Sequence, residues 1–60
     1  YLEIVRSLIL DRGIIIDADK LDRCAERFAL KRNGRSPRIA RQFADSLQSK
    51  LALGIDPEKM

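Results

Sequence analysis

Five basic residues stand close together in the middle of this 60-residue sequence. No acidic residue lies among positions 31–41, and the segments before and after this stretch each carry one more acid than base. The positive surplus of the chain, a formal net charge of +3, therefore lies in one short stretch. Such a local surplus indicates a site for an anion. The basic residues are Lys31, Arg32, Arg35, Arg38 and Arg41.

Residues 34–38, Gly-Arg-Ser-Pro-Arg, predict a turn that leads into a helix. Ser36 suits the N-cap and Pro37 suits the first helical position. The positive end of a helix favours acids in the first turn, whereas this sequence places Arg38 there and Arg41 one turn later. A phosphate group would relieve the conflict, because helix N-termini and arginine both bind it. The candidate phosphate-binding residues are therefore Arg35, Arg38 and Arg41, although a solvated corner between two helices is the simpler interpretation of their charge alone.

The elements that must position these arginines are helices. Apolar residues recur at spacings of three and four over residues 1–12, which predicts a first helix that ends at Gly13. The β-branched run 14–16 predicts an extended connector, and no second segment exists with which it could form a sheet. Asp17 is the expected N-cap of a second helix over about Ala18 to Arg32, with Ile16 placed to contact Leu21 as a hydrophobic staple.

A third helix is expected from the Ser36 cap to about Leu53, closed by Gly54. The pair Asp56-Pro57 repeats the cap-plus-proline pattern, so a short fourth helical turn could follow. The fold class is therefore all-α, a small three-helix bundle with that optional fourth turn. The apolar positions expected to form its core are Leu2, Val5, Leu8, Ile9, Leu21, Cys24, Ala25, Phe28, Ala40, Phe43, Ala44, Leu47 and Leu51.

Several classes of function are excluded by composition. The chain has one cysteine, Cys24, and no histidine, which argues against disulfide frameworks, zinc sites and histidine-based catalysis. Cys24 falls on an apolar helix face and is expected to be inert packing in a reducing, cytoplasmic setting. The longest apolar runs have only three residues, so no membrane span is expected. The sequence begins with Tyr1 and is already in a helical pattern, so we expect residues 1–60 to be a single helical domain of a longer protein.

The segment 34–43, GRSPRIARQF, resembles the sensor-2 segment of AAA+ ATPases, where a helix of the C-terminal lid begins with a Gly/Pro-containing turn and an arginine. Its GxxPRIA pattern is similar to that of the bacterial Holliday-junction branch-migration motor. The order of elements over about residues 2–48 is also similar to that lid. A group of less characterised bacterial AAA+ proteins shares the YLxIV-type opening at Tyr1 to Val5 and the RS-x-R-x-A-x-QF pattern at Arg35 to Phe43.

The resemblance implies a lid that covers a nucleotide, ATP or ADP with magnesium, bound mainly by a preceding α/β domain. Arg38 matches the sensor-2 arginine and would reach the phosphates, coupling nucleotide state to lid movement. Neighbouring subunits of an AAA+ ring would be further partners. The chain contains neither a Walker A loop nor an acidic Walker B strand, so it is not expected to hydrolyse ATP or to bind nucleotide stably by itself.

Two other functions stay open from the sequence. The basic stretch could belong to a helical nucleic-acid-binding module, although it contains no aromatic residue for base stacking. The bundle could also be purely structural or oligomer-forming, with its arginines paired to acids of a neighbour. The substrate of the motor, the ring size and the AAA+ subfamily do not follow from the sequence.

Overall fold

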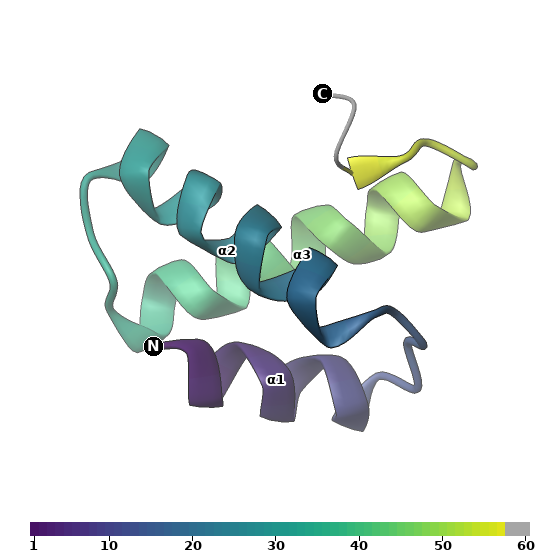
Figure 1. Cartoon of the computed structure of the whole chain (residues 1–60), viewed down its shortest axis with the longest axis horizontal. Coiled ribbons are helices and arrows are strands. Elements are labelled where there is room, and N and C mark those ends of the chain that lie inside the picture. The colour runs from purple at the N-terminus through teal and green to yellow at the C-terminus, as the bar shows by residue number, and fades with distance from the viewer. Residues whose placement is uncertain (58–60) are drawn as a thin grey trace.

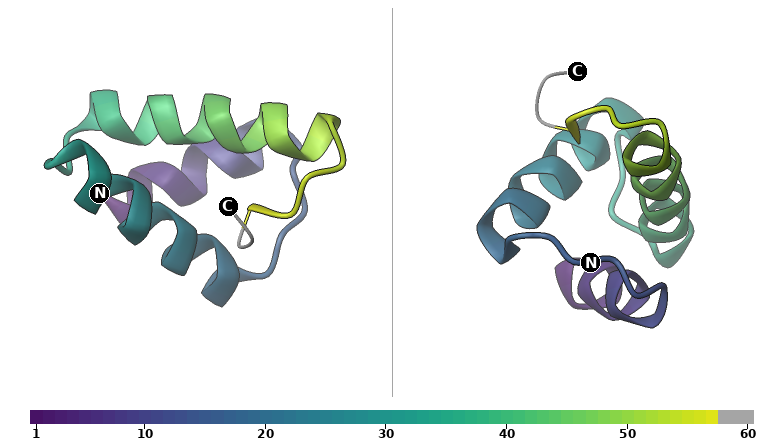
Figure 2. Two further views of the ribbon diagram at one scale, coloured as in Figure 1. Left: turned by 90° about the horizontal axis from the view of Figure 1, so that it is seen from above. Right: turned by 90° about the vertical axis from the view of Figure 1, so that its right-hand side faces the viewer.

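The computed structural model describes residues 1–57, which form an all-α bundle of three helices. The helices are α1 (Leu2–Asp11), α2 (Ala18–Arg32) and α3 (Pro37–Ala52), each within one residue of its predicted bounds. α1 and α3 begin at the same end of the molecule and run in the same direction, and α2 runs back (Figure 1). Seen end-on in Figure 2, the three helices lie at the corners of a triangle. Among these residues, no helix is long and apolar enough to cross a membrane.

All three helices end with the same backbone arrangement. Gly13, Asn33 and Gly54 adopt positive φ angles of 69°, 56° and 76°, directly after the last turn of α1, α2 and α3. In each case the next residue donates a backbone hydrogen bond five residues back, such as Ile14 N to Ile9 O at 3.2 Å. This is the Schellman arrangement, which satisfies carbonyl groups that the helix itself leaves unpaired. The predicted stops at Gly13 and Gly54 are therefore confirmed. At the end of α2, Asn33 takes the left-handed position and Gly34 follows it.

The helix starts also follow local chemistry. The Asp17 carboxylate accepts a hydrogen bond from Lys20 N at 3.2 Å, and the Ser36 hydroxyl accepts one from Ile39 N at 3.3 Å. Both predicted N-caps are confirmed. In the connector, Ile14 and Ile16 pack against the core while Ile15 is 99% exposed, the alternation expected of an extended segment.

The core lies along the axis of the bundle and contains one helical face from each element. Its buried members are Val5, Ile9, Leu21, Cys24, Ala25, Ala29, Ala40, Phe43, Ala44 and Leu47. Leu2, Leu8 and Phe28 are partly buried against it, and the Phe28 and Phe43 rings meet at 5.5 Å between centroids. Cys24 is buried in this core, as predicted.

Two expectations about the core need correction. Leu51, predicted on the apolar face of the third helix, is 40% exposed because the last turn of α3 and the residues after it lie at the surface. Ala29, which was not predicted to be in the core, is buried.

The predicted fourth helical turn begins at Asp56 and Pro57 and continues into residues 58–60, which lie outside the described residues.

Candidate functional site

Nearly every residue of the turn from α2 to α3 has a backbone conformation or a hydrogen bond that fixes its position. Asn33 takes the left-handed conformation, and Gly34 N donates to Ala29 O at 3.1 Å. Ser36 caps α3, and Pro37 occupies its first helical turn. Because proline fixes its own φ angle and has no N–H, it begins a helix without losing a hydrogen bond. Arg38 therefore projects from a firmly defined helix start.

Arg38 and Arg41 lie exposed on the first two turns of α3, three residues apart, so they share one side of the helix. The first turn of α3 contains no acid. Within residues 1–57, neither guanidinium forms an ion pair or side-chain hydrogen bond. The structure thus brings together two of the three predicted phosphate-binding residues and gives them no counter-charge in the described part of the chain.

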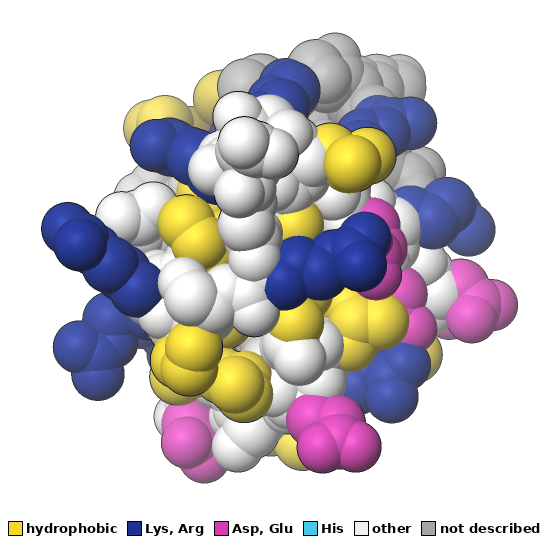
Figure 3. Space-filling view, turned by 90° about the vertical axis from the view of Figure 1, so that its left-hand side faces the viewer, with side chains coloured by type: hydrophobic (Ala, Val, Ile, Leu, Met, Phe, Trp, Pro, Cys, Tyr) yellow, Lys and Arg dark blue, Asp and Glu magenta, His cyan; other side chains and the backbone are white. Residues whose placement is uncertain are grey.

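The two arginines line a shallow groove between α1 and α3. Its other lining residues are Ile4, Leu8 and Pro37, and its volume is about 340 Å³. α1 supplies the apolar wall and α3 supplies the cations. Figure 3 views the molecule from the end at which α1 and α3 begin, where basic side chains project beside exposed hydrophobic ones. A groove of this kind suits a ligand with both an anionic and an apolar part.

Arg35 is placed differently from Arg38. Its Nη2 atom donates to Glu26 Oε2 of α2 at 2.6 Å, in a pair that is largely exposed. Close to this pair, the Tyr1 hydroxyl donates to the Ala25 carbonyl at 2.9 Å. The pKa of Tyr1 is raised, first by burial and then by the negative charge of Glu26, against a lowering by Arg35. Sequence spacing gave no signal for Glu26 or Tyr1 at this end of the molecule.

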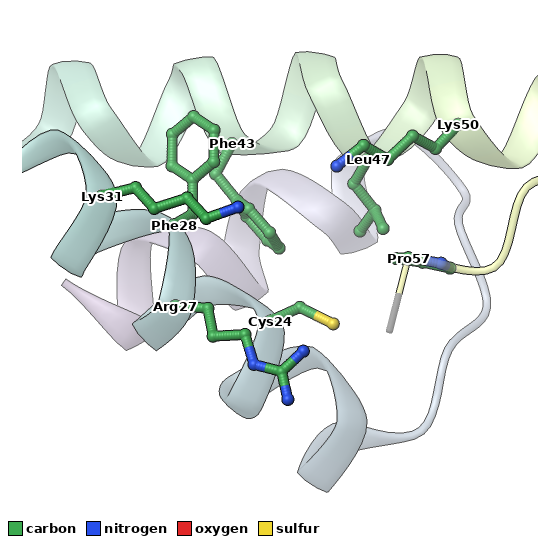
Figure 4. Close-up of a pocket in the computed structure, with 8 residues that line it drawn as sticks. All are labelled: Cys24, Arg27, Phe28, Lys31, Phe43, Leu47, Lys50 and Pro57. Atoms are coloured by element: carbon green, nitrogen blue, oxygen red, sulfur yellow. The ribbon is translucent and has the colours of Figure 1, made fainter. Parts of the chain in front are cut away.

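The remaining two cations of the basic stretch lie elsewhere. Arg32 stacks over the Phe28 ring, with its guanidinium carbon 4.9 Å from the ring centroid. Lys31 lines a second pocket, of about 50 Å³, together with Phe28, Phe43 and other residues that are absent from the Arg38 groove (Figure 4). The basic stretch is therefore not one continuous surface: its five cations are divided among a groove, an ion pair, an aromatic ring and a separate pocket.

The second pocket lies between α2, α3 and the segment after α3. Arg27, Lys31 and Lys50 are its basic lining residues, and Cys24 and Leu47 are among its apolar ones (Figure 4). It is too small for an aromatic ring, since a cavity that holds benzene measures about 150 Å³. In the described part of the chain, no cluster of three or more His, Cys, Asp or Glu residues could hold a metal ion.

Residues 1–51 match the family described as "protein of unknown function (DUF815)". The chain belongs to the DUF815 family. The matched region includes α1, α2 and all but the last residue of α3, and therefore the whole groove at Arg38. No curated protein and no solved structure matches the chain.

Proposed function

We propose that this DUF815 unit is the C-terminal lid of an AAA+ ATPase and that Arg38 senses the phosphates of the bound nucleotide. The observation that carries the proposal is the placement of Arg38 and Arg41 at the start of α3 without a counter-charge among residues 1–57. Two cations beside the positive end of a helix repel each other and the helix dipole. A phosphate in the groove would turn this repulsion into attraction.

The backbone at the start of α3 supports the same proposal. Pro37 has no N–H, and the Ile39 N–H is used by the Ser36 hydroxyl. Ala40 N makes the first backbone bond of the helix, to Ser36 O at 3.1 Å. Among the N–H groups of the first turn, that of Arg38 is thus the one left to bind a ligand. The Arg38 side chain would contact the same ligand. Backbone N–H groups and guanidinium groups together form strong anion sites.

In this proposal the nucleotide is ATP or ADP with magnesium, held mainly by an α/β domain that precedes the lid. Contact between Arg38 and the γ-phosphate would stabilise one lid orientation, and loss of that phosphate would release it. A ligand shifts a conformational equilibrium only through such a difference in affinity between two states. The lid movement would then be transmitted to neighbouring subunits of the ring. The proposal places the protein in the cytoplasm, where a buried cysteine such as Cys24 stays reduced.

The dispersal of the basic stretch favours this function over nucleic-acid binding. A nucleic-acid surface needs several cations on one face to follow a phosphate backbone. Here Arg35 is paired with Glu26, and Arg32 lies over Phe28. Only Arg38 and Arg41 of the five line the groove, a number that suits one di- or triphosphate.

Steady-state ATP hydrolysis by the full-length protein that contains this unit tests the proposal. Arg38→Ala should lower the hydrolysis rate by about tenfold or more, as expected when a hydrogen bond to a charged group is lost. Arg32→Ala is the matched control, because it removes the same charge from the end of α2, away from the groove. A rate unchanged by Arg38→Ala, or lowered equally by Arg32→Ala, would show that Arg38 does not sense the nucleotide.

A further inference from the structure

The start of α1 and the turn before α3 are fixed to the same place on α2. The Tyr1 hydroxyl donates to the carbonyl of Ala25, and Arg35 donates to the carboxylate of the next residue, Glu26, at 2.6 Å. Figures 1 and 2 both show the N-terminal end of the chain beside this turn. Two segments that are 34 positions apart in the sequence thus share one anchoring point.

The anchoring groups also act on each other electrostatically. After burial, the largest influence on the pKa of Tyr1 is the negative charge of Glu26, which raises it, and Arg35 lowers it. The tyrosine hydroxyl therefore lies within the field of both members of the pair. We call Tyr1, Glu26 and Arg35 the anchor cluster.

A short connection with little backbone freedom joins the anchor cluster to Arg38. Arg35 is followed directly by the Ser36 cap and by Pro37, whose backbone has little freedom. A displacement of the Arg35 backbone is therefore transmitted to the first turn of α3. We infer that the Glu26–Arg35 pair positions Arg38 for phosphate contact, so that Arg35 is a positioning residue and not itself a phosphate ligand. This inference rests on the proposed function.

Glu26→Gln distinguishes the two alternative roles of Arg35, because they predict different results. If Arg35 positions Arg38, neutralising Glu26 weakens one of the contacts that hold the turn and lowers the preference of the full-length protein for ATP over ADP. The expected loss is about two- to fivefold, the effect of one exposed ion pair. If Arg35 instead binds phosphate, neutralising Glu26 frees its guanidinium, and the preference for ATP should rise or stay unchanged. Either of those results would overturn the inference.

Three further variants complete the experiment. Arg35→Ala should lower the ATP preference as much as Glu26→Gln does, and the exchanged pair Glu26→Arg with Arg35→Glu should restore it. Arg12→Ala is the matched control, because it removes an arginine paired with Asp45 at 2.7 Å, between the far end of α1 and α3. It should leave the preference unchanged. Failure of the exchanged pair to restore the ATP preference would contradict a positioning role.

Amide hydrogen exchange of Ile39 and Ala40 without nucleotide separates failure of the inference from failure of the proposed function, because both amides are hydrogen-bonded to Ser36. The inference expects faster exchange in both Glu26→Gln and Arg35→Ala than in the wild type. If Arg38→Ala leaves the ATP preference intact, the proposed function is wrong whatever the exchange rates show. If Arg38→Ala lowers the preference but Glu26→Gln changes neither exchange nor preference, the anchor cluster is not a positioning device.

Discussion

Leu47→Ala should destabilise the bundle severely. Leu47 is 1% exposed in the middle of the core, between residues of all three helices. Truncation of a buried leucine costs about 2–5 kcal/mol, through lost burial and the cavity that remains. A chain of 60 residues has a free energy of unfolding of only about 3–9 kcal/mol. One substitution therefore removes a large part of the stability of the fold.

The assay is thermal unfolding of the 60-residue chain, followed by far-ultraviolet circular dichroism. A loss of about 3 kcal/mol corresponds to a fall of about 12–24 °C in Tm for a domain of this size. Leu10→Ala makes the same chemical change within α1 at a side chain that is 76% exposed, and should alter stability by no more than about 0.5 kcal/mol. Equal shifts in the two variants would refute the packing described for Leu47.

Two further predictions concern the backbone and pH. Gly13→Ala should cost about 1–2 kcal/mol through its positive φ angle alone, since an added Cβ would meet nothing within 4 Å. Gly34→Ala should cost little stability, because the φ of Gly34 lies outside the positive range and the added Cβ would lie an ordinary 3.9 Å from Ile39. Urea unfolding of the two variants measures both losses, and equal losses of stability would contradict this account. Because the folded state raises the pKa of Tyr1, stability should be complete below about pH 10 and fall as the pH rises above it. Tyr1→Phe should flatten that dependence. The ultraviolet absorbance of the only tyrosine reports its ionisation directly, and a wild-type titration at the pKa of free tyrosine would contradict the raised pKa of Tyr1.

The helices and their ends were predictable because their signals are local. Asp17 and Ser36 act as caps through hydrogen bonds to residues three positions later, and Gly13 ends a helix through its own backbone freedom. Such chemistry can be read from a few neighbouring residues. The period of the apolar residues likewise identified the faces that meet in the core, with Ala29 and Leu51 as the exceptions.

The surroundings of the candidate site were less predictable, because they depend on contacts between helices. The sequence placed Arg35, Arg38 and Arg41 near one helix start but gave no basis for pairing Arg35 with Glu26, which lies on the preceding helix. It also gave no reason to place Ile4 beside Arg41. Those relations follow from how α1 and α2 pack against α3. Packing thus separates one paired arginine from the two that line the groove.

The central claim, that Arg38 detects the γ-phosphate, is tested most directly by the affinities of the full-length protein for ATP and ADP, measured by calorimetry with and without Arg38→Ala. The account predicts that the substitution weakens ATP binding by about 10- to 100-fold, as expected for a charged hydrogen bond, and weakens ADP binding much less. Equal weakening for both nucleotides, or no weakening of either, would contradict it.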